Sequence, residues 1–561
     1  MNVIRNGCCV LAALLAVRVA MAQPASRPAA ELLFTNGNIY TLESARPRAE
    51  ALAVAGGRIL AIGSTAEVLA MRGAQSRIVD LRGRTVLPGL IDAHGHMQNL
   101  GSFALGRLDL SSAKSYDEVI AMVRAKAEQT PPGQWILGGR WDHESWPDRA
   151  LPTHPALSEA TAQHPVWLRR VDGHAGLANA EALRRAGLTR DSRNPAGGEL
   201  LRDSEGELTG VLVDNAVDLI QPEGGDAGAR ELLLAAQKLC LAAGLTGVHD
   251  AGVSPADVQI YQELAAGGEL KLRVYGMLSA PFAVQFFREN PPLIGERITV
   301  RAAKLYVDGA MGSRGAWLLE PYSDRATDDN GRPYVGLAVM NPDFIRVIAD
   351  DGLRRGYQVC THAIGDRGNR EVLDAYAAAL AGRPNPDARF RVEHAQLLSA
   401  ADIPRFAQLG VIASMQPTHC TSDMRWVETR VGRERAAGAY AWASLLRSGA
   451  MIAGGSDFPV ESHNPFLGLY AAITRQDASG APAGGWRPEQ RLTREEALRA
   501  LTIGAAHAAF EEQHKGTLKA GKLADFVVLD RDVMLCEPRD LLETRVLRTV
   551  IGGETVFEAG P

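Results

Sequence analysis

An apolar run that ends in two histidines constrains the fold of this chain more than any other feature. The run covers residues 88–96 and reads PGLIDAHGH. Residues i and i+2 of a β-strand point to the same side, so His94 and His96 can offer two imidazoles to one metal ion. A pair of histidines at a surface turn is the alternative interpretation of so short a motif.

Four later apolar, strand-like runs also end in a residue that can bind a metal. They end at Lys304, His362, His394 and Asp457. Taken singly, a histidine at a strand end is more often a hydrogen-bonded structural residue, and a lysine usually reaches solvent. Together, however, the strand ends carry two His, Lys, His, His and Asp in that order, which indicates one shared metal centre.

The middle of the chain alternates strand-like runs with helical patterns, such as those at 229–243 and 371–380. This alternation predicts a parallel α/β barrel over residues 87–519. Active sites of such barrels lie at the C-terminal ends of the strands, where the candidate ligands fall. The interval from His96 to Lys304 is longer than barrel strands need. We therefore expect an inserted subdomain at about 99–162 that helps to select the substrate.

Both ends of the chain have another pattern. Residues 32–86 and 520–558 alternate apolar and polar side chains between glycine-rich turns. This alternation is typical of short antiparallel strands.

The ligand order resembles that of the amidohydrolase superfamily. The most similar branch is the one that includes N-substituted formamide deformylases, and the resemblance runs from about 32 to about 558. It is carried by WILGGRW (135–141), VDGHA (171–175), VDGAMGSR (307–314), THAIGD (361–366) and GSDFPVE (455–461). The resemblance implies a (β/α)8 TIM-like barrel, with the two chain ends combined in one small β-sandwich. It also implies hydrolysis of C–N bonds in amides or formamides.

The ligand types suit a borderline divalent ion, zinc first, with manganese, iron or cobalt as alternatives. By resemblance, one ion is held by His94, His96 and Asp457, and a second by His362 and His394.

Lys304 needs a separate argument, because a free lysine has a pKa of about 10.4 and its ammonium would repel a metal. The resemblance implies that the Lys304 amine reacts with carbon dioxide, and that the resulting carbamate bridges two zinc ions together with a hydroxide. A salt bridge from Lys304 to a neighbouring acid such as Asp308 is the alternative.

The remaining candidate residues surround this centre. By resemblance, Asp457 orients the hydroxide and carries its proton to the leaving amine. His174 closes what looks like the second barrel strand. It is predicted to donate a hydrogen bond to the substrate carbonyl, with a structural role as the alternative. His249 closes the probable third strand and is expected to pack or to support other residues. Predicted substrate contacts are Trp141, Arg314 and Phe458, for which core packing or loop anchoring is the alternative.

The first 22 residues are typical of a secretory signal peptide. Arg5 precedes an apolar stretch at 8–17, and the small residues of Ala20-Met21-Ala22 form a cleavage site before Gln23. The stretch is too short to span a membrane. We expect a periplasmic or secreted protein without membrane insertion, and a cytoplasmic one if the leader is not processed. A net charge of −5 indicates no nucleic-acid partner.

The sequence therefore favours a metal-dependent hydrolase acting on a small amide-like molecule. A mononuclear deaminase-type hydrolase is one alternative, since such enzymes usually lack the carbamate lysine. A catalytically inactive periplasmic binding protein is the other, although such a protein has no need of the complete ligand set. The specific substrate, the metal and the oligomeric state, a homodimer among the options, stay open.

Overall fold

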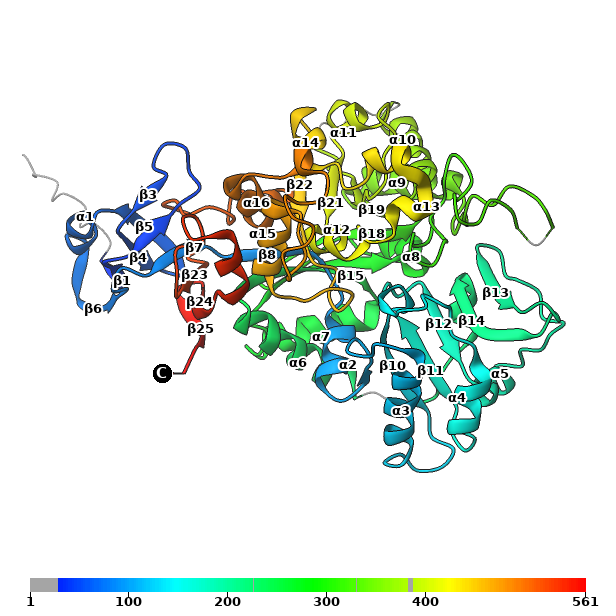
Figure 1. The fold of residues 1–561 in the computed structure, drawn as a ribbon. Helices are drawn as coiled ribbons and strands as arrows, with labels where there is room; N and C mark the ends of the chain where they lie inside the picture. Colours follow the sequence, from blue (N-terminus) through cyan, green and yellow to red (C-terminus); the bar gives the residue numbers. More distant parts are fainter. Residues whose placement is uncertain (1–28, 225–226, 329, 382–386, 561) are drawn as a thin grey trace, which may run out of the picture.

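The computed structural model describes residues 29–224, 227–328, 330–381 and 387–560 (Figure 1). The predicted signal peptide, residues 1–22, lies outside the described residues. In the part of the chain that is described, no helix combines the length and the apolar character that a membrane crossing needs.

A nearly closed parallel barrel forms the centre of the molecule, which confirms the predicted α/β barrel. Among the described residues its eight strands pair in chain order: β8 (Leu90–Gly95), β15 (Leu245–Val253), β16 (Arg273–Ser279), β18 (Ile298–Tyr306), β19 (Gln358–Ala363), β20 (Arg391–His394), β21 (Ile412–Met415) and β22 (Ile452–Gly454). A bridge between Gly95 and Phe458 returns the chain beyond β22 to β8. Every residue of β8, β19, β20, β21 and β22 is buried, as expected for strands covered on both faces.

Helices between the strands cover the outside of the barrel. The longer ones are α6 (Ala229–Ala242), α7 (Pro255–Ala266), α9 (Pro342–Arg355) and α10 (Asp366–Ala381). Helix α6 buries Leu233, Ala236 and Cys240, whose spacing of three and four residues forms one apolar stripe. Helix α9 starts at the Asn341 cap and stops at Gly356, whose φ of 79° suits a left-handed helix end.

Two small sheets at the chain ends lie beside one another (Figure 1, blue and red). One contains β1 (Ala30–Thr35), β4 (Ala51–Ala55), β5 (Arg58–Gly63) and β6 (Arg72–Asp80). The other contains β2 (Asn38–Tyr40), β3 (Arg48–Ala49), β7 (Thr85–Pro88), β23 (Phe526–Leu529), β24 (Val546–Ile551) and β25 (Glu554–Glu558). The two sheets share one apolar cluster, in which the rings of Phe34 and Phe526 meet edge to face at 4.9 Å.

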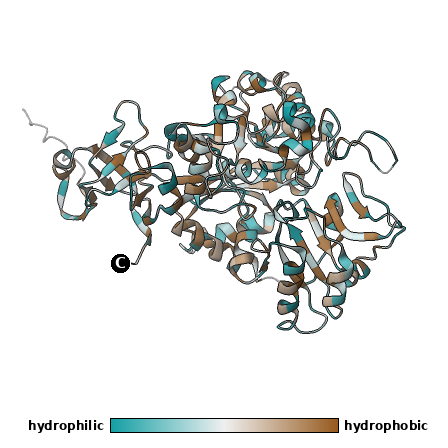
Figure 2. Ribbon diagram, viewed as in Figure 1, coloured by the Kyte–Doolittle hydropathy of each residue, from teal (hydrophilic) through white to brown (hydrophobic). Residues whose placement is uncertain are grey.

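A further sheet, here called the inserted sheet, lies between β8 and β15 in the sequence. Its described strands are β9 (Leu108–Asp109), β10 (Ile136–Trp141), β11 (Val166–Arg170), β12 (Ala175–Ala178), β13 (Gly198–Arg202) and β14 (Leu208–Asp214). In Figure 2 many residues of its strands are brown, which marks them as hydrophobic.

The inserted sheet reaches residue 214, well past residue 162, where the sequence-based expectation ended. The reason is that β11 is an apolar run resembling a barrel strand, yet it pairs antiparallel with β12. His174 consequently lies in the turn between β11 and β12, and not at the end of the second barrel strand. That strand is β15, which carries His249.

Candidate metal centre and active site

The predicted metal ligands meet at the C-terminal ends of the barrel strands. His94, His394 and Asp457 offer ligand atoms that all lie within 4.8 Å of one another. Each of the three is buried. The other predicted ligands adjoin them, and the six together are here called the strand-end cluster: His94, His96, Lys304, His362, His394 and Asp457.

The other three members contact this group directly. His96 Nε2 lies 3.0 Å from Asp457 Oδ1. Lys304 Nζ lies 3.0 Å from His94 Nε2. The ring centroids of His362 and His394 are 4.6 Å apart. Strands that are distant in the sequence thus bring all six side chains to one place.

Hydrogen bonds between β8 and the segment after β22, a contact here called the seam, fix part of this cluster. Asp92 Oδ1 accepts hydrogen bonds from the amides of His94 and Ser456, both at 3.0 Å, and Oδ2 accepts one from Ser456 Oγ at 2.6 Å. The Asp457 amide donates to His94 O at 2.7 Å. These bonds help to hold Asp457 near a φ of 61°, in the left-handed region that non-glycine residues seldom adopt, and His394 has a φ of 75° in the same region.

Hydrogen bonds behind the site assign the histidine tautomers. Nδ1–H donates to the following acceptors: from His94 to Glu393 Oε2 at 2.5 Å, from His96 to Ala251 O at 2.8 Å, and from His394 to Gln416 Oε1 at 2.8 Å. Each Nε2 is then a lone-pair acceptor. Burial, together with the charge of Lys304, lowers the pKa of His94 to about 4, which keeps this imidazole neutral at pH 7.

One contact in the cluster tests whether these residues fit a metal ion. His96 Nε2 and Asp457 Oδ1 are both acceptors, yet they face one another at 3.0 Å. Asp457 Oδ1 has no hydrogen-bond partner among the described residues. Facing lone pairs on neutral imidazole and carboxylate are the donor set that a divalent cation needs.

A buried ion pair supports His94 from behind. Glu393, which accepts from His94, also pairs with Arg391 through a 2.7 Å contact between Nε and Oε1. Burial raises the pKa of Glu393, but the Arg391 guanidinium and His94 outweigh it and lower that pKa well below the usual range. Arg391 Nη1 also contacts His249 Nδ1 at 2.9 Å. His249 therefore has the supporting role expected of it.

Lys304 lies at the base of the site with 1% of its surface exposed. Burial lowers its pKa to about 8. Among the described residues Lys304 forms no ion pair with Asp308. Asp308 instead accepts hydrogen bonds from three backbone amides, those of Trp317, Ile364 and Gly365. A salt bridge from Lys304 to Asp308 in particular is therefore not formed among the described residues.

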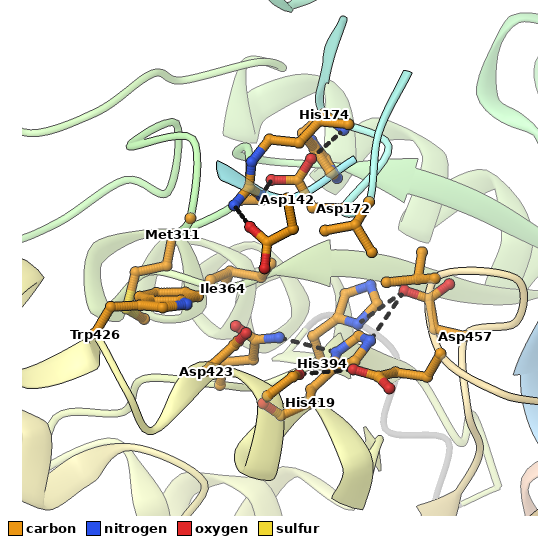
Figure 3. Close-up of a pocket in the computed structure, with 18 of the residues that line it drawn as sticks. Asp142, Asp172, His174, Met311, Ile364, His394, His419, Asp423, Trp426 and Asp457 are labelled. Atoms are coloured by element: carbon orange, nitrogen blue, oxygen red, sulfur yellow. Dashed lines mark hydrogen bonds and ion pairs between the residues drawn. The ribbon is translucent and has the colours of Figure 1, made fainter. Parts of the chain in front are cut away.

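A cavity of about 90 Å³ lies against the strand-end cluster (Figure 3). One wall comes from the inserted sheet, where Arg170 binds Asp172 at 2.5 Å and Asp142 at 2.7 Å. The apolar part of the wall includes Met311, Ile364 and Trp426. The site thus combines a cluster of candidate metal ligands with an adjoining pocket that has both polar and apolar walls.

His174 faces this cavity from the inserted sheet. Its Nδ1 contacts Asp214 Oδ1 at 2.7 Å, and its ring centroid lies 4.7 Å from that of His362. Burial lowers the pKa of His174, but the hydrogen bond and the charge of Asp214 outweigh it, so the net shift is upward.

The three predicted substrate contacts are absent from the described residues that line the cavity. Trp141 is in the core of the inserted sheet, where its Nε1 donates to Leu168 O at 2.9 Å. Phe458 is fully buried under Gly95. Arg314 pairs with Asp324 at 2.9 Å. The cavity is lined by the aromatic side chain of Trp426, and not by those of Trp141 and Phe458.

Sequence reasoning missed His419, which lies on α12 (Pro417–Asp423). This buried residue lines the cavity, and its ring stacks on that of His394 at 5.8 Å. The only signal in the sequence is proximity, because His419 lies inside α12 and four residues beyond Met415, where β21 ends.

Comparisons with known proteins agree with this architecture. The amidohydrolase family model matches residues 77–557. Protein LONG AFTER FAR-RED 3 of Arabidopsis thaliana is 36% identical, over 94% of this chain and 92% of the plant protein. An N-substituted formamide deformylase of Arthrobacter pascens is 30% identical, over 94% of this chain and 98% of that enzyme.

A solved structure is also similar along nearly its whole length. It is an uncharacterized metal-dependent hydrolase from Pyrococcus furiosus, with a TM-score of 0.70 and 29% identity, covering 90% of this chain and 99% of that one. Since the family match and these relatives extend over most of the sequence, the chain belongs to the amidohydrolase family.

Proposed function

We propose that this protein is a metal-dependent hydrolase that cleaves the C–N bond of a small amide or formamide. The observation that carries the proposal is the contact between His96 Nε2 and Asp457 Oδ1, two acceptors 3.0 Å apart beside a cavity. The similarity to an N-substituted formamide deformylase and to a metal-dependent hydrolase supports it.

In this proposal, His94, His96 and Asp457 hold one divalent ion, and His362 and His394 hold a second. Lys304, carboxylated by carbon dioxide, would supply a further ligand to these ions, and zinc is the first choice for both positions. When bound, such ions polarise a carbonyl group and acidify water.

The chain's own groups then manage the proton and the substrate. Asp457 accepts the proton of the attacking water and passes it to the leaving nitrogen as the C–N bond breaks, which releases an acid and an amine. Its Oδ1 faces the histidines, and Oδ2 lies on the side of His419. His174 donates a hydrogen bond to the substrate carbonyl from the inserted sheet.

A mononuclear hydrolase is the second candidate. The group that best fits a single ion, among the described residues, consists of His94, His394 and Asp457. This group draws on ligands assigned above to different ions. A count of metal ions per chain separates the two candidates.

The test uses purified zinc-loaded protein and a panel of N-formyl amines, N-acyl amino acids, dipeptides, carbamates and ring amidines. We expect turnover of at least one amide or formamide, abolished by chelation and restored by zinc. Preference for ring amidines with one metal per chain would favour the deaminase-type alternative. A well-folded, zinc-loaded protein that hydrolyses nothing in the panel would contradict the proposal and favour a binding protein.

We further propose that the two end sheets, from 32–86 and 520–558, form one structural domain, and that the protein is exported after cleavage before Gln23. The proposal for export rests on the pattern of Arg5, the apolar stretch and the small residues at 20–22.

A further inference from the structure

His419 occupies a defined position that the proposed mechanism does not use. It lies on α12, directly beyond β21, while His174 approaches the cavity from the inserted sheet. Figure 3 shows His419 next to His394 and Asp457, with His174 on another side of the cavity. The two histidines therefore meet a bound molecule from different walls.

The hydrogen bond to Gln396 sets the tautomer of His419. Gln396 Nε2 lies 3.1 Å from His419 Nδ1 and donates to it, because an amide nitrogen carries only donors. Nδ1 is then the acceptor, and the proton of the neutral imidazole is on Nε2. His419 consequently presents an N–H group at the end of the ring away from Gln396.

This N–H group is unpaired among the described residues. Only 7% of the surface of His419 is exposed, so bulk water does not readily take the place of a partner. A buried donor without an acceptor costs about 1–3 kcal/mol. Such a cost is expected where a ligand, and not the protein, supplies the acceptor.

The position of Asp457 indicates which atom that ligand supplies. His419 Nε2 lies 3.7 Å from Asp457 Oδ2, too far for a hydrogen bond. The N–H group and the carboxylate thus border the same space at the end of the cavity next to the strand-end cluster. An amide held there for attack places its carbonyl carbon near Asp457, and its oxygen can accept from His419 as well as from His174.

A role as a metal ligand fits His419 less well. Its ring is nearly parallel to that of His394, with an interplanar angle of 19°, so the two rings stack.

We propose that His419 is a further catalytic residue, whose Nε2–H donates a hydrogen bond to the carbonyl oxygen of the substrate as negative charge develops. The inference rests on the proposed function, because it requires an amide bound beside Asp457. Removal of one such donor lowers kcat by about 10²–10³-fold in well-studied hydrolases.

The experiment compares three substitutions in zinc-loaded protein. His419→Ala removes the donor, and we expect kcat to fall by about 10²–10³-fold while KM and metal content stay near wild type. His419→Gln places an amide NH2 near the position of Nε2, and should recover part of the lost rate. His419→Asn reaches only the position of Nδ1 and should not. His154→Ala, on α4 (His154–Ala160) and away from the cavity, is the control.

A second measurement does not depend on turnover. Formate, the small acid released from a formamide, should bind zinc-loaded wild type at least tenfold more tightly than His419→Ala. Unchanged kcat and formate affinity in His419→Ala would overturn the inference, as would loss of metal or a change in KM alone. Wild type that binds formate in this His419-dependent way but hydrolyses nothing would refute the proposed function only. Wild type that does neither would refute both.

Discussion

Replacement of Glu393 by glutamine tests how the chain prepares His94 to bind a metal. The change keeps the shape of the side chain and removes its charge. In the folded protein Glu393 is fully buried, and its Oε2 accepts from His94 Nδ1 at 2.5 Å and from Arg391 Nη2 at 2.9 Å. The carboxylate therefore orients the imidazole, increases its basicity as a ligand, and compensates a buried guanidinium.

Two effects of different size should follow. Loss of a carboxylate partner behind a metal-binding histidine typically weakens metal affinity by about 10–100-fold, or about 1.4–2.7 kcal/mol. Leaving the Arg391 cation without its partner should lower the free energy of unfolding by about 3–5 kcal/mol, the usual cost of breaking a buried ion pair.

Competition with a chromophoric chelator measures the zinc affinity, and urea denaturation of the metal-free protein measures stability. The matched control is Asp525→Asn, which breaks another buried pair, with Arg273 at 2.7 Å, away from the cluster. The control should lose stability and keep its zinc affinity. Glu393→Gln protein that is folded and binds zinc within threefold of wild type would refute this reasoning.

Four further outcomes are expected. Asp457→Asn should keep the fold and lower kcat by at least about 10²–10⁴-fold, since the amide cannot carry a proton; near-normal turnover with intact metal would assign the base elsewhere, first to His174. Elemental analysis of protein grown with zinc and bicarbonate should give close to two metals per chain, and a consistent value of one would exclude the bridging carbamate. Because burial lowers the pKa of Lys304 to about 8, and only the neutral amine reacts with carbon dioxide, reconstitution at fixed dissolved carbon dioxide should accelerate from pH 6 to 8 and then level off; a pH-independent rate would contradict this. N-terminal sequencing of protein from the native host should begin at Gln23, and a cytoplasmic pool that starts at Met1 would count against export.

The strand-end cluster could be predicted from the sequence, because its grouping follows from one rule. Parallel strands point their carboxyl ends in one direction, so polar residues that close successive apolar runs gather at one mouth. The rule needs no knowledge of loop conformation. It does not reach His419, which lies on α12 beyond the end of β21.

The inserted sheet was harder to predict because local patterns do not specify pairing partners. The run of β11 is as apolar as a barrel strand, yet β11 pairs antiparallel with β12, a choice made by tertiary contacts. His174 was for this reason assigned to the wrong element, although it does reach the cavity. Trp141 packs in the core of the inserted sheet and Trp426 lines the cavity. Their local sequences do not distinguish these two positions.

The seam between β8 and the segment after β22 has a consequence for biosynthesis. Asp92 is bonded to Ser456, 364 residues later in the chain. A ribosome makes His94 and His96 early but adds Asp457 only when four-fifths of the protein has been translated. A chain that is cut or released before that point carries the histidines without their carboxylate. Stable uptake of metal would then separate finished molecules from truncated ones, and protease resistance conferred by zinc would report that translation had been completed.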